Sequence, residues 1–337
     1  MPARLSNRTR CALSLSLVVY AFTCPLQAET TARLLIGRNA GEMILETGSK
    51  KADLTGFAGG SRLTYNRDFN FFGLGLTTRW NTVELEGRFR TTGYYVDTDL
   101  ARNEDFALDQ YSRQQPSGFD RKTWAYRDTA HTISGSYNFA DAYGRSRQSM
   151  YDFDLFLRWF FLDDDPETTI GGPYLGLSTG YGYSKYYVYD VIQYIRSTRS
   201  FFIGPIGIGN SFSNAVLQFR GGAGWRSDST PWQFDLGLYI ISGYNTARDH
   251  HVQRGINFVV YEAYGNGLLL QSALSYRTTE SLKLGVSFYF HRYFSHGFMD
   301  PRDGHGSDAL LTQLTDSQSV WISTKEAGAE LQLNWIF

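Results

Sequence analysis

The last eleven positions of the sequence alternate between apolar residues and small or polar ones, with Ile336 as the one exception. Every odd-numbered position from Ala327 to Phe337 is apolar, and the residues between them include Gly328, Glu330, Gln332 and Asn334. Because successive side chains of an extended strand point to opposite faces, this pattern predicts a strand with one apolar and one polar face. Two structures give such a pattern. One is a strand of a membrane β-barrel whose polar residues face the lumen, and the other is an amphipathic edge strand of a soluble sheet.

The same alternation recurs along most of the chain and predicts about ten strands. Residues 83–90 show it clearly, with apolar or small residues at the odd positions and glutamate or arginine at the even ones. The expected strands cover residues 34–45, 61–80, 83–90, 153–159, 170–189, 215–226, 232–240, 256–276, 282–290 and 327–337. An even number of antiparallel strands, apolar outside and polar inside, is typical of an outer-membrane barrel. We therefore expect an all-β, single-domain fold: a ten-stranded antiparallel transmembrane β-barrel with long extracellular loops.

The connections between these strands fall into two classes that alternate along the chain. Short turns are expected near Asn81, Asp163, Asp228 and Thr279. Longer connections are expected at residues 95–131, 186–200, 248–255 and 294–319. The Gly-rich segment 204–213 is expected to extend the connection at 186–200. In outer-membrane barrels the short turns are periplasmic and the longer loops are extracellular.

The amino terminus has the pattern of a secretory signal peptide. Three arginines lie within the first ten residues, and an apolar run follows from Ala12 to Thr23. Cleavage is expected after Ala28, so that residues 1–28 form the signal peptide and residues 29–337 the barrel. An N-terminal anchor helix is disfavoured because the run is short. A lipid anchor on Cys24 is disfavoured because Pro25 follows it.

Composition changes this picture by excluding several kinds of chemistry. Both cysteines, Cys11 and Cys24, fall within the expected signal peptide, so we expect no disulfide, thiolate metal site or cysteine nucleophile. The net charge of −1 argues against a nucleic-acid partner. Aromatic residues make up 16% of the chain and glycines number 34, which fits a curved sheet with aromatic girdles. A soluble β-sandwich or lectin is the alternative fold.

Two short motifs at expected strand ends carry candidate chemistry. Asp97 and Asp99 are separated by one residue where the third strand enters a long connection. Two carboxylates held close together raise the pKa of one of them, which suits acid–base work on a water. Asp249 lies two residues before His251, and such an acid can orient an imidazole and tune its pKa. Each motif taken alone is also compatible with a solvated polar loop.

Taken together, the two motifs resemble those of the omptins, a family of ten-stranded outer-membrane proteases. The family has an Asp-x-Asp pair where the third strand enters the second outer loop, and an Asp-x-His pair where the seventh strand enters the fourth. Asp97 with Asp99, and Asp249 with His251, occupy these positions. Glu42 on the first strand is similar to an acidic substrate-binding residue of the family, and the basic turn of the first hairpin is similar to Gly48-Ser49-Lys50-Lys51.

The resemblance implies an endopeptidase mechanism at the extracellular rim. Asp249 would polarise His251, the general base, and Asp97 and Asp99 would lie across the cleft. A water between the two pairs would attack the scissile carbonyl, with no metal, no covalent intermediate and no cofactor. The implied partners are a peptide or protein substrate, outer-membrane lipid and lipopolysaccharide, which the family requires for activity. The C-terminal aromatic Phe337 implies recognition by the barrel assembly machinery.

Some residues depart from the family pattern. Ala247 stands where the family has a second pocket acid, which puts its preference for basic residues in doubt. His250 lies between Asp249 and His251, so the sequence leaves open which histidine is the base. The alternative function is a non-enzymatic outer-membrane barrel, such as an adhesin, a small porin or a structural protein. The acidic segment 300–308 matches no spacing of a known cation site, so no metal is expected.

Overall fold

The computed structural model of the chain describes residues 29–50, 57–107, 132–133, 136–161, 171–195, 200–204, 206–305 and 318–337. All of the regular structure in these residues is β-strand. The strands are β1 (Glu29–Lys50), β2 (Phe57–Asn66), β3 (Phe69–Trp80), β4 (Val83–Thr91), β5 (Val96–Ala107), β6 (Thr132–Ile133), β7 (Ser136–Phe160), β8 (Pro173–Ile195), β9 (Ser200–Ile203), β10 (Ile208–Ser229), β11 (Trp232–His251), β12 (Ile256–Thr279), β13 (Leu282–Asp303) and β14 (Gln318–Ile336). The expected signal peptide lies outside the described residues.

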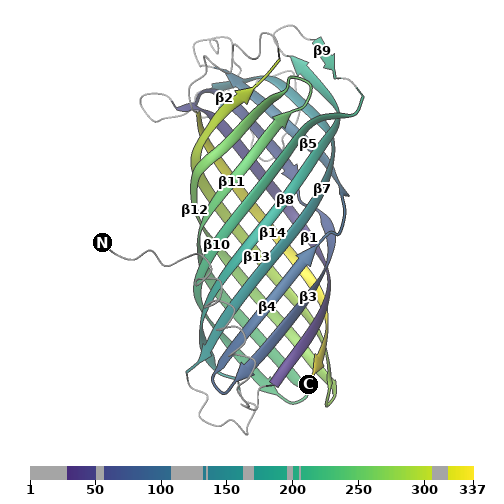
Figure 1. The fold of residues 1–337 in the computed structure, drawn as a ribbon, viewed down its shortest axis with the longest axis vertical. Helices are drawn as coiled ribbons and strands as arrows, with labels where there is room; N and C mark the ends of the chain where they lie inside the picture. Colours follow the sequence, from purple (N-terminus) through teal and green to yellow (C-terminus); the bar gives the residue numbers. More distant parts are fainter. Residues whose placement is uncertain are drawn as a thin grey trace, which may run out of the picture.

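Ten of these strands close a barrel by antiparallel pairing (Figure 1). The ring runs β1–β3–β4–β7–β8–β10–β11–β12–β13–β14, and β14 pairs with β1 over eighteen positions. β2 continues the line of β3 beyond a break at Arg67 and Asp68, and β5 continues the line of β4 in the same way. β2 pairs with β1 and β5, and β5 pairs with β7. The prediction of a ten-stranded antiparallel barrel is therefore confirmed.

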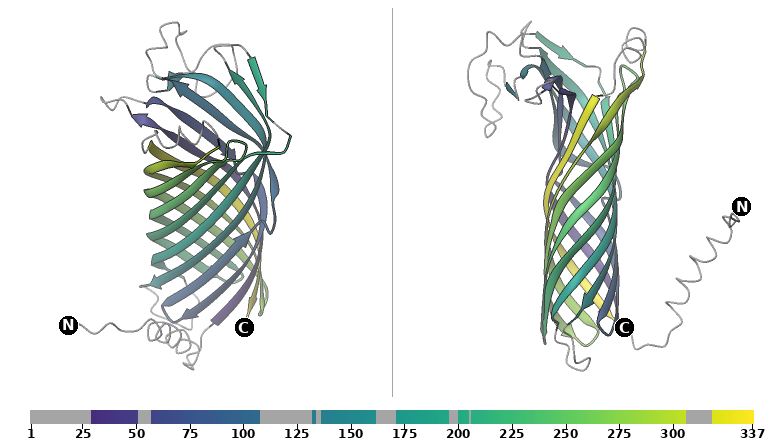
Figure 2. Two further views of the ribbon diagram at one scale, coloured as in Figure 1. Left: turned by 45° about the horizontal axis from the view of Figure 1, so that its top comes forward. Right: turned by 90° about the vertical axis from the view of Figure 1, so that its left-hand side faces the viewer.

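The two ends of the barrel differ in their connections. One end, which we call the turn end, carries the tight turns at Asn81–Thr82, Thr230–Pro231 and Glu280–Ser281. The opposite end, which we call the loop end, carries the β11–β12 hairpin and the extensions of β7, β8 and β9 (Figure 2). The short turns expected near Asn81, Asp228 and Thr279 are confirmed, whereas the one near Asp163 lies outside the described residues. Most of the Gly-rich segment 204–213 extends strand β10 instead of a loop.

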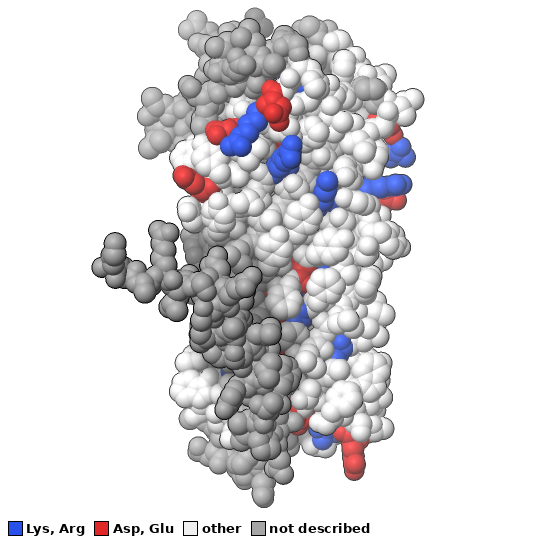
Figure 3. All heavy atoms as spheres, in the orientation of Figure 1, with Lys and Arg blue, Asp and Glu red and all other residues white. Residues whose placement is uncertain are grey.

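Alternation along each strand produces an apolar outer surface. On β11 the side chains of Trp232, Phe234, Leu236, Leu238 and Ile240 are all exposed on the outside. On the face drawn in Figure 3 the middle of the outer wall shows few charged residues, and most of the charged residues in view lie toward the loop end. Such a band is what a barrel presents to the hydrocarbon of a membrane. On β11 and β12 the band ends at a pair of tyrosines, Tyr244 and Tyr264, whose rings are in contact at a tilted angle.

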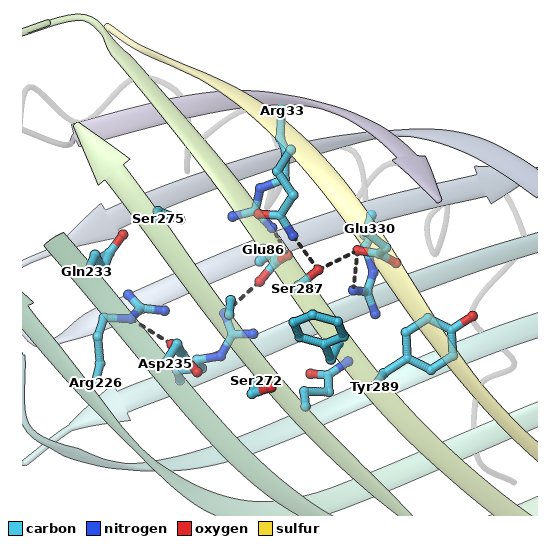
Figure 4. Close-up of a pocket in the computed structure, with 16 residues that line it drawn as sticks. Arg33, Glu86, Arg226, Gln233, Asp235, Ser272, Ser275, Ser287, Tyr289 and Glu330 are labelled. Atoms are coloured by element: carbon cyan, nitrogen blue, oxygen red, sulfur yellow. Dashed lines mark hydrogen bonds and ion pairs between the residues drawn. The ribbon is translucent and has the colours of Figure 1, made fainter. Parts of the chain in front are cut away.

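Toward the turn end, the inner surface of the barrel carries a network of ion pairs (Figure 4). Arg158 contacts both Glu84 and Glu86, and Arg226 joins Glu84 to Asp235. The network contains seven arginines and seven acids: Arg33, Arg67, Arg88, Arg90, Arg158, Arg220 and Arg226 with Glu84, Glu86, Asp152, Asp154, Asp235, Glu326 and Glu330. Its charges balance, so each buried ion has a partner that offsets its loss of water.

The terminal strand joins this network as expected from its alternation. Glu330, Gln332 and Asn334 are buried and face the lumen. Glu330 accepts a hydrogen bond from Ser287 Oγ and pairs with Arg90. Three cavities lined by residues of the network measure about 80 Å³ each, which is small for the inside of a barrel, so side chains fill much of the space between the described walls.

Above the ion pairs, an apolar cluster spans the lumen near the loop end. Tyr65 lies at its centre, with its ring 4.7 Å from that of Tyr186 and 5.2 Å from that of Phe212. The cluster consists of Met43, Leu45, Leu63, Tyr65, Ala101, Tyr186, Val188, Phe212, Ala247, Val260, Ala263, Met299, Val320 and Ile322. Because its members come from strands all around the ring, the cluster forms a packed layer beneath the loop end.

Candidate functional site

A cavity of about 490 Å³ opens above the apolar cluster at the loop end. Asp249 and His251 of β11 line one side of it, and Asn103 and Asp105 of β5 also line it. Residues of β8 and β10 contribute further walls, and members of the apolar cluster form its floor. The cavity thus combines an apolar base with titratable side chains above it, which is the usual character of a binding site.

The Asp249–His251 pair is held by the alternation of β11. Asp249 and His251 point inward, and the position between them, His250, is not part of the cavity lining. His251 Nε2 lies 3.1 Å from Asp249 Oδ2, and Asp249 is only 3% exposed. The His251 ring also packs edge-on against Phe258, with centroids 5.2 Å apart. The geometry therefore favours His251 over His250 as the partner of Asp249.

Asp249 also carries an atom without a partner. Its second oxygen, Oδ1, is buried and makes no hydrogen bond within the described part of the chain. Both residues lie beyond Tyr244, where the outer apolar band ends, so the membrane interior does not surround them. Burial lowers the pKa of the His251 imidazole, but the charge and hydrogen bond of Asp249 outweigh burial, and the net pKa is raised above its ordinary value.

Asp105 is the acid that shares the cavity with His251. Ser61 Oγ donates a hydrogen bond of 2.6 Å to Asp105 Oδ1, and Gln193 Nε2 donates one of 3.2 Å to Oδ2. Burial raises the pKa of the Asp105 carboxyl, and the nearby positive charge of protonated His251 acts in the opposite direction. The two groups are therefore close enough for the charge of each to influence the other.

Asp97 and Asp99 do not face this cavity, contrary to the expectation from sequence. The Asp97 side chain is 79% exposed and pairs with Arg147, whose guanidinium lies over Tyr189 on the outer wall. Asp99 is exposed and lies in a β-bulge, with a backbone φ of 67°. In the pairing of β5 with β7, Asp97 is opposite Arg147 but Leu100 is opposite Arg145, so β5 carries one extra residue.

The bulge explains why Asp105 faces inward and Asp97 does not. One extra residue in a strand exchanges the faces of all positions beyond it. Before the bulge, the odd-numbered Asp97 points outward and Thr98 is buried. After the bulge, odd-numbered Ala101, Asn103 and Asp105 line the cavity. The sequence carries no signal for Asp105, because the stretch that contains it is expected to be a loop.

Glu42 is also placed differently from the expectation. It is exposed and shares the outward face of β1 with Leu34 and Ile36, because all three have the same parity. Its inward neighbour Met43 is fully buried in the apolar cluster. Ala247, the position of the missing pocket acid, is buried in the same cluster. The structure therefore places no acid from β1 or position 247 in the cavity.

The arrangement suits acid–base chemistry on a water. Among the described residues, no group of three or more His, Cys, Asp or Glu side chains is placed to hold a metal ion. A histidine with an acid behind it and a second acid nearby can remove a proton from a water and return it to a leaving group.

No helix in the described part of the chain is long and apolar enough to cross a membrane.

The chain is similar to a known sequence family and to several solved structures. The sequence model of the family described as "Putative porin" matches residues 50–331. The fold is similar to the outer membrane protease OmpT from Escherichia coli, with a TM-score of 0.64 at 11% identity over 92% of this chain and 97% of that one. Weaker similarity is found to the translocator domain of the autotransporter NalP from Neisseria meningitidis, with a TM-score of 0.35 at 9% identity over 98% and 96% of the chains. OprG from Pseudomonas aeruginosa gives a TM-score of 0.31 at 10% identity over 90% and 95%. No curated protein matches the chain by sequence.

Proposed function

The chain belongs to the family described as "Putative porin", and on this outer-membrane frame we propose that it is an endopeptidase. Its active groups are Asp105 and the Asp249–His251 pair, which line one cavity at the loop end. The observation that carries the proposal is the 3.1 Å contact between His251 and buried Asp249, with Asp105 in the same cavity. The fold similarity to OmpT supports the frame, although at 11% identity it concerns the fold alone.

In the proposed mechanism, His251 is the general base. Asp249 accepts the hydrogen bond from one ring nitrogen, Nε2, and so orients the imidazole and stabilises its protonated form. The other ring nitrogen removes a proton from a water that Asp105 holds as an acceptor. The water oxygen bonds to the scissile carbonyl carbon, and the protonated imidazole then gives its proton to the leaving amine as the C–N bond breaks.

Neutral donors for the developing oxyanion are available in the same cavity. The amide side chains of Asn210 and Gln253 line it on the side of β10 and the β11–β12 hairpin. Amide donors of this kind stabilise a tetrahedral oxyanion without altering the charge of the resting site. The mechanism uses only side chains of this chain, and it replaces the pair Asp97 and Asp99 by the single carboxylate of Asp105.

The loop end faces the outside of the cell in this proposal. Short turns on the periplasmic side and longer strands and loops outside are typical of bacterial barrels. A cavity at the outer rim would meet peptides and proteins in the medium, while the apolar band contacts outer-membrane lipid. Lipopolysaccharide is included in the assay because the resemblance to the omptins implies that it is required for activity.

The test uses adjacent histidines as a matched pair. The protein is refolded in detergent with lipopolysaccharide and assayed on a quenched fluorogenic peptide library. His251→Ala is expected to lower kcat/KM by about 10²- to 10⁴-fold, the usual contribution of a general base. His250→Ala, one position away and outside the cavity lining, is expected to retain activity. Equal activity of the two variants, or no cleavage by the folded wild-type protein, would contradict the proposed endopeptidase function.

A channel is the second candidate function, because the family description names a porin. The filled lumen argues against free diffusion through the barrel. The apolar cluster and the ion-pair network lie one above the other along the described lumen, and the cavities within the network are about 80 Å³ each. An open porin instead leaves an aqueous path through its polar interior.

A further inference from the structure

The floor of the cavity is formed by uncharged, mainly apolar side chains. We define the floor as the five members of the apolar cluster that line the cavity: Leu63, Tyr65, Ala101, Val188 and Met299. All five are less than 8% exposed. They come from β2, β5, β8 and β13, so the floor is built by strands on several sides of the barrel and is fixed by their pairing.

The lower walls continue this apolar character. Val191 and Phe258 pack against the apolar cluster and also line the cavity. Phe258 in addition contacts the ring of His251, at 5.2 Å between centroids. Apolar surface therefore extends from the floor directly to the proposed base.

Apolar surface also reaches the mouth of the cavity through β9. Phe202 lines the cavity and remains 55% exposed, and its neighbours Phe201 and Ile203 are exposed as well. Isolated exposed apolar residues are ordinary on protein surfaces, but these three are consecutive, and Phe202 adjoins the cavity. This segment extends the apolar surface from the floor to the outer edge of the site.

The charged groups of the cavity are not members of the floor, and apart from Asp249 Oδ1 they have polar interactions of their own. Asp249 pairs with His251, and Asp105 accepts hydrogen bonds from Ser61 and Gln193. Arg102 and Arg254 also have polar interactions of their own. No charged side chain belongs to the floor, and Asp249, whose charge reaches Tyr65, is already paired with His251. A lysine or arginine entering the floor would therefore lose water without a new carboxylate partner within the floor.

We propose that the cavity selects peptides by a large apolar side chain, such as leucine, methionine or phenylalanine, that enters the floor next to the cleaved bond. This inference rests on the proposed function and specifies its substrate class. A cavity of about 490 Å³ has room for such a side chain and for adjoining backbone. Burial of the apolar side chain places the scissile carbonyl beside His251, because Phe258 links the floor to the imidazole.

The first experiment measures selectivity with a peptide series that differs at one position only. The wild-type protein is expected to cleave the leucine and phenylalanine peptides at least about tenfold better, in kcat/KM, than the lysine, arginine or aspartate peptides. Val191→Asp introduces a carboxylate beside the floor and is expected to shift preference toward lysine and arginine. Val191→Leu is the matched control and is expected to keep the apolar preference. Preference of the wild-type protein for basic residues, or no preference, would overturn the inference.

A second variant tests the floor by volume. Ala101→Leu adds three carbon atoms to the floor and is expected to reduce cleavage of the phenylalanine peptide more than that of the alanine peptide. Heat-modifiable migration on electrophoresis gels reports whether each variant has formed its barrel. An unchanged ratio of the two peptides in a folded Ala101→Leu barrel would contradict the assignment of the floor.

A binding measurement separates this inference from the proposed function. Folded His251→Ala protein is titrated by calorimetry with the leucine and lysine peptides, which it is not expected to cleave. If the leucine peptide binds more tightly and the wild-type protein cleaves neither peptide, the apolar site is supported and the peptidase function is contradicted. If the wild-type protein cleaves peptides but the leucine peptide does not bind more tightly, the peptidase function is supported and the apolar site is contradicted.

Discussion

The contact between His251 and Asp249 should determine how activity depends on pH. Asp249 raises the pKa of the imidazole above its ordinary value, even though burial acts in the opposite direction. A general base must be neutral, so kcat/KM is expected to rise with pH through an apparent pKa above about 6.5. In Asp249→Asn the lowering effect of burial remains without the carboxylate, so the apparent pKa should fall. A pH–rate profile of both proteins measures this, and an unchanged midpoint in the variant would contradict the role of Asp249.

The same pKa has a consequence for stability. A histidine whose pKa is higher in the folded state than in the unfolded state stabilises the fold when it is protonated. The contribution of His251 is therefore complete below about pH 6.5 and is lost as the pH rises through the folded-state pKa. Activity and this part of the stability thus change in opposite directions with pH.

The odd or even position of a residue in its strand explains which side-chain positions could be predicted from the sequence and which could not. Glu42 has the same parity as Leu34 and Ile36 in one uninterrupted strand, so its outward position could have been predicted from alternation alone. Glu84 and Glu86 are buried in the lumen, as the same alternation predicts. Asp105 could not be found in this way, because a bulge separates it from the regular part of the strand line.

Among the elements, the bulge in β5 has the greatest effect on the site. It places Asp105 in the cavity and leaves Asp97 on the outer wall. Asp99 adopts a φ of 67°, a conformation that glycine and, less readily, aspartate or asparagine accept. A sequence shows neither the extra residue nor its position, because the pairing register of two long strands depends on contacts across the sheet.

Removal of the bulge should therefore inactivate the site while the barrel remains folded. Deletion of Asp99 restores regular pairing of β5 with β7 and turns Asp105 to the outer face, so cleavage is expected to fall by at least about 100-fold. Asp99→Gly keeps the extra residue and its positive φ, and is expected to retain activity. Peptide cleavage by the two folded variants makes the comparison. Retained activity in the deletion variant would mean that the face of β5 does not matter.

Considered as a whole, the molecule is a barrel with a filled lumen and a site at one end. The ten strands, their order and the apolar outer face followed from the sequence, because alternation and turn residues are local signals. The pairing of the seven arginines with seven acids could be anticipated only as a polar lumen, since the partners come from distant strands. The apolar floor was not anticipated, because its residues are scattered over the whole chain.

The filled lumen predicts how the barrel behaves in an electrical measurement. Purified protein in a planar lipid bilayer is expected to give no steady open-channel current at low voltage. The balanced ion pairs and the apolar cluster occupy the path that ions would take. A stable single-channel conductance would instead support the porin function that the family description names.

The measurement that tests the proposed site most directly compares two aspartates of the same strand. Asp105→Asn and Asp97→Asn remove one carboxylate charge each with little change of shape, one inside the cavity and one on the outer wall. We expect Asp105→Asn to lower kcat/KM for the leucine peptide by about 100-fold or more, and Asp97→Asn to leave it within about twofold of the wild-type value. Loss of activity in Asp97→Asn with full activity in Asp105→Asn would contradict the site proposed for this barrel.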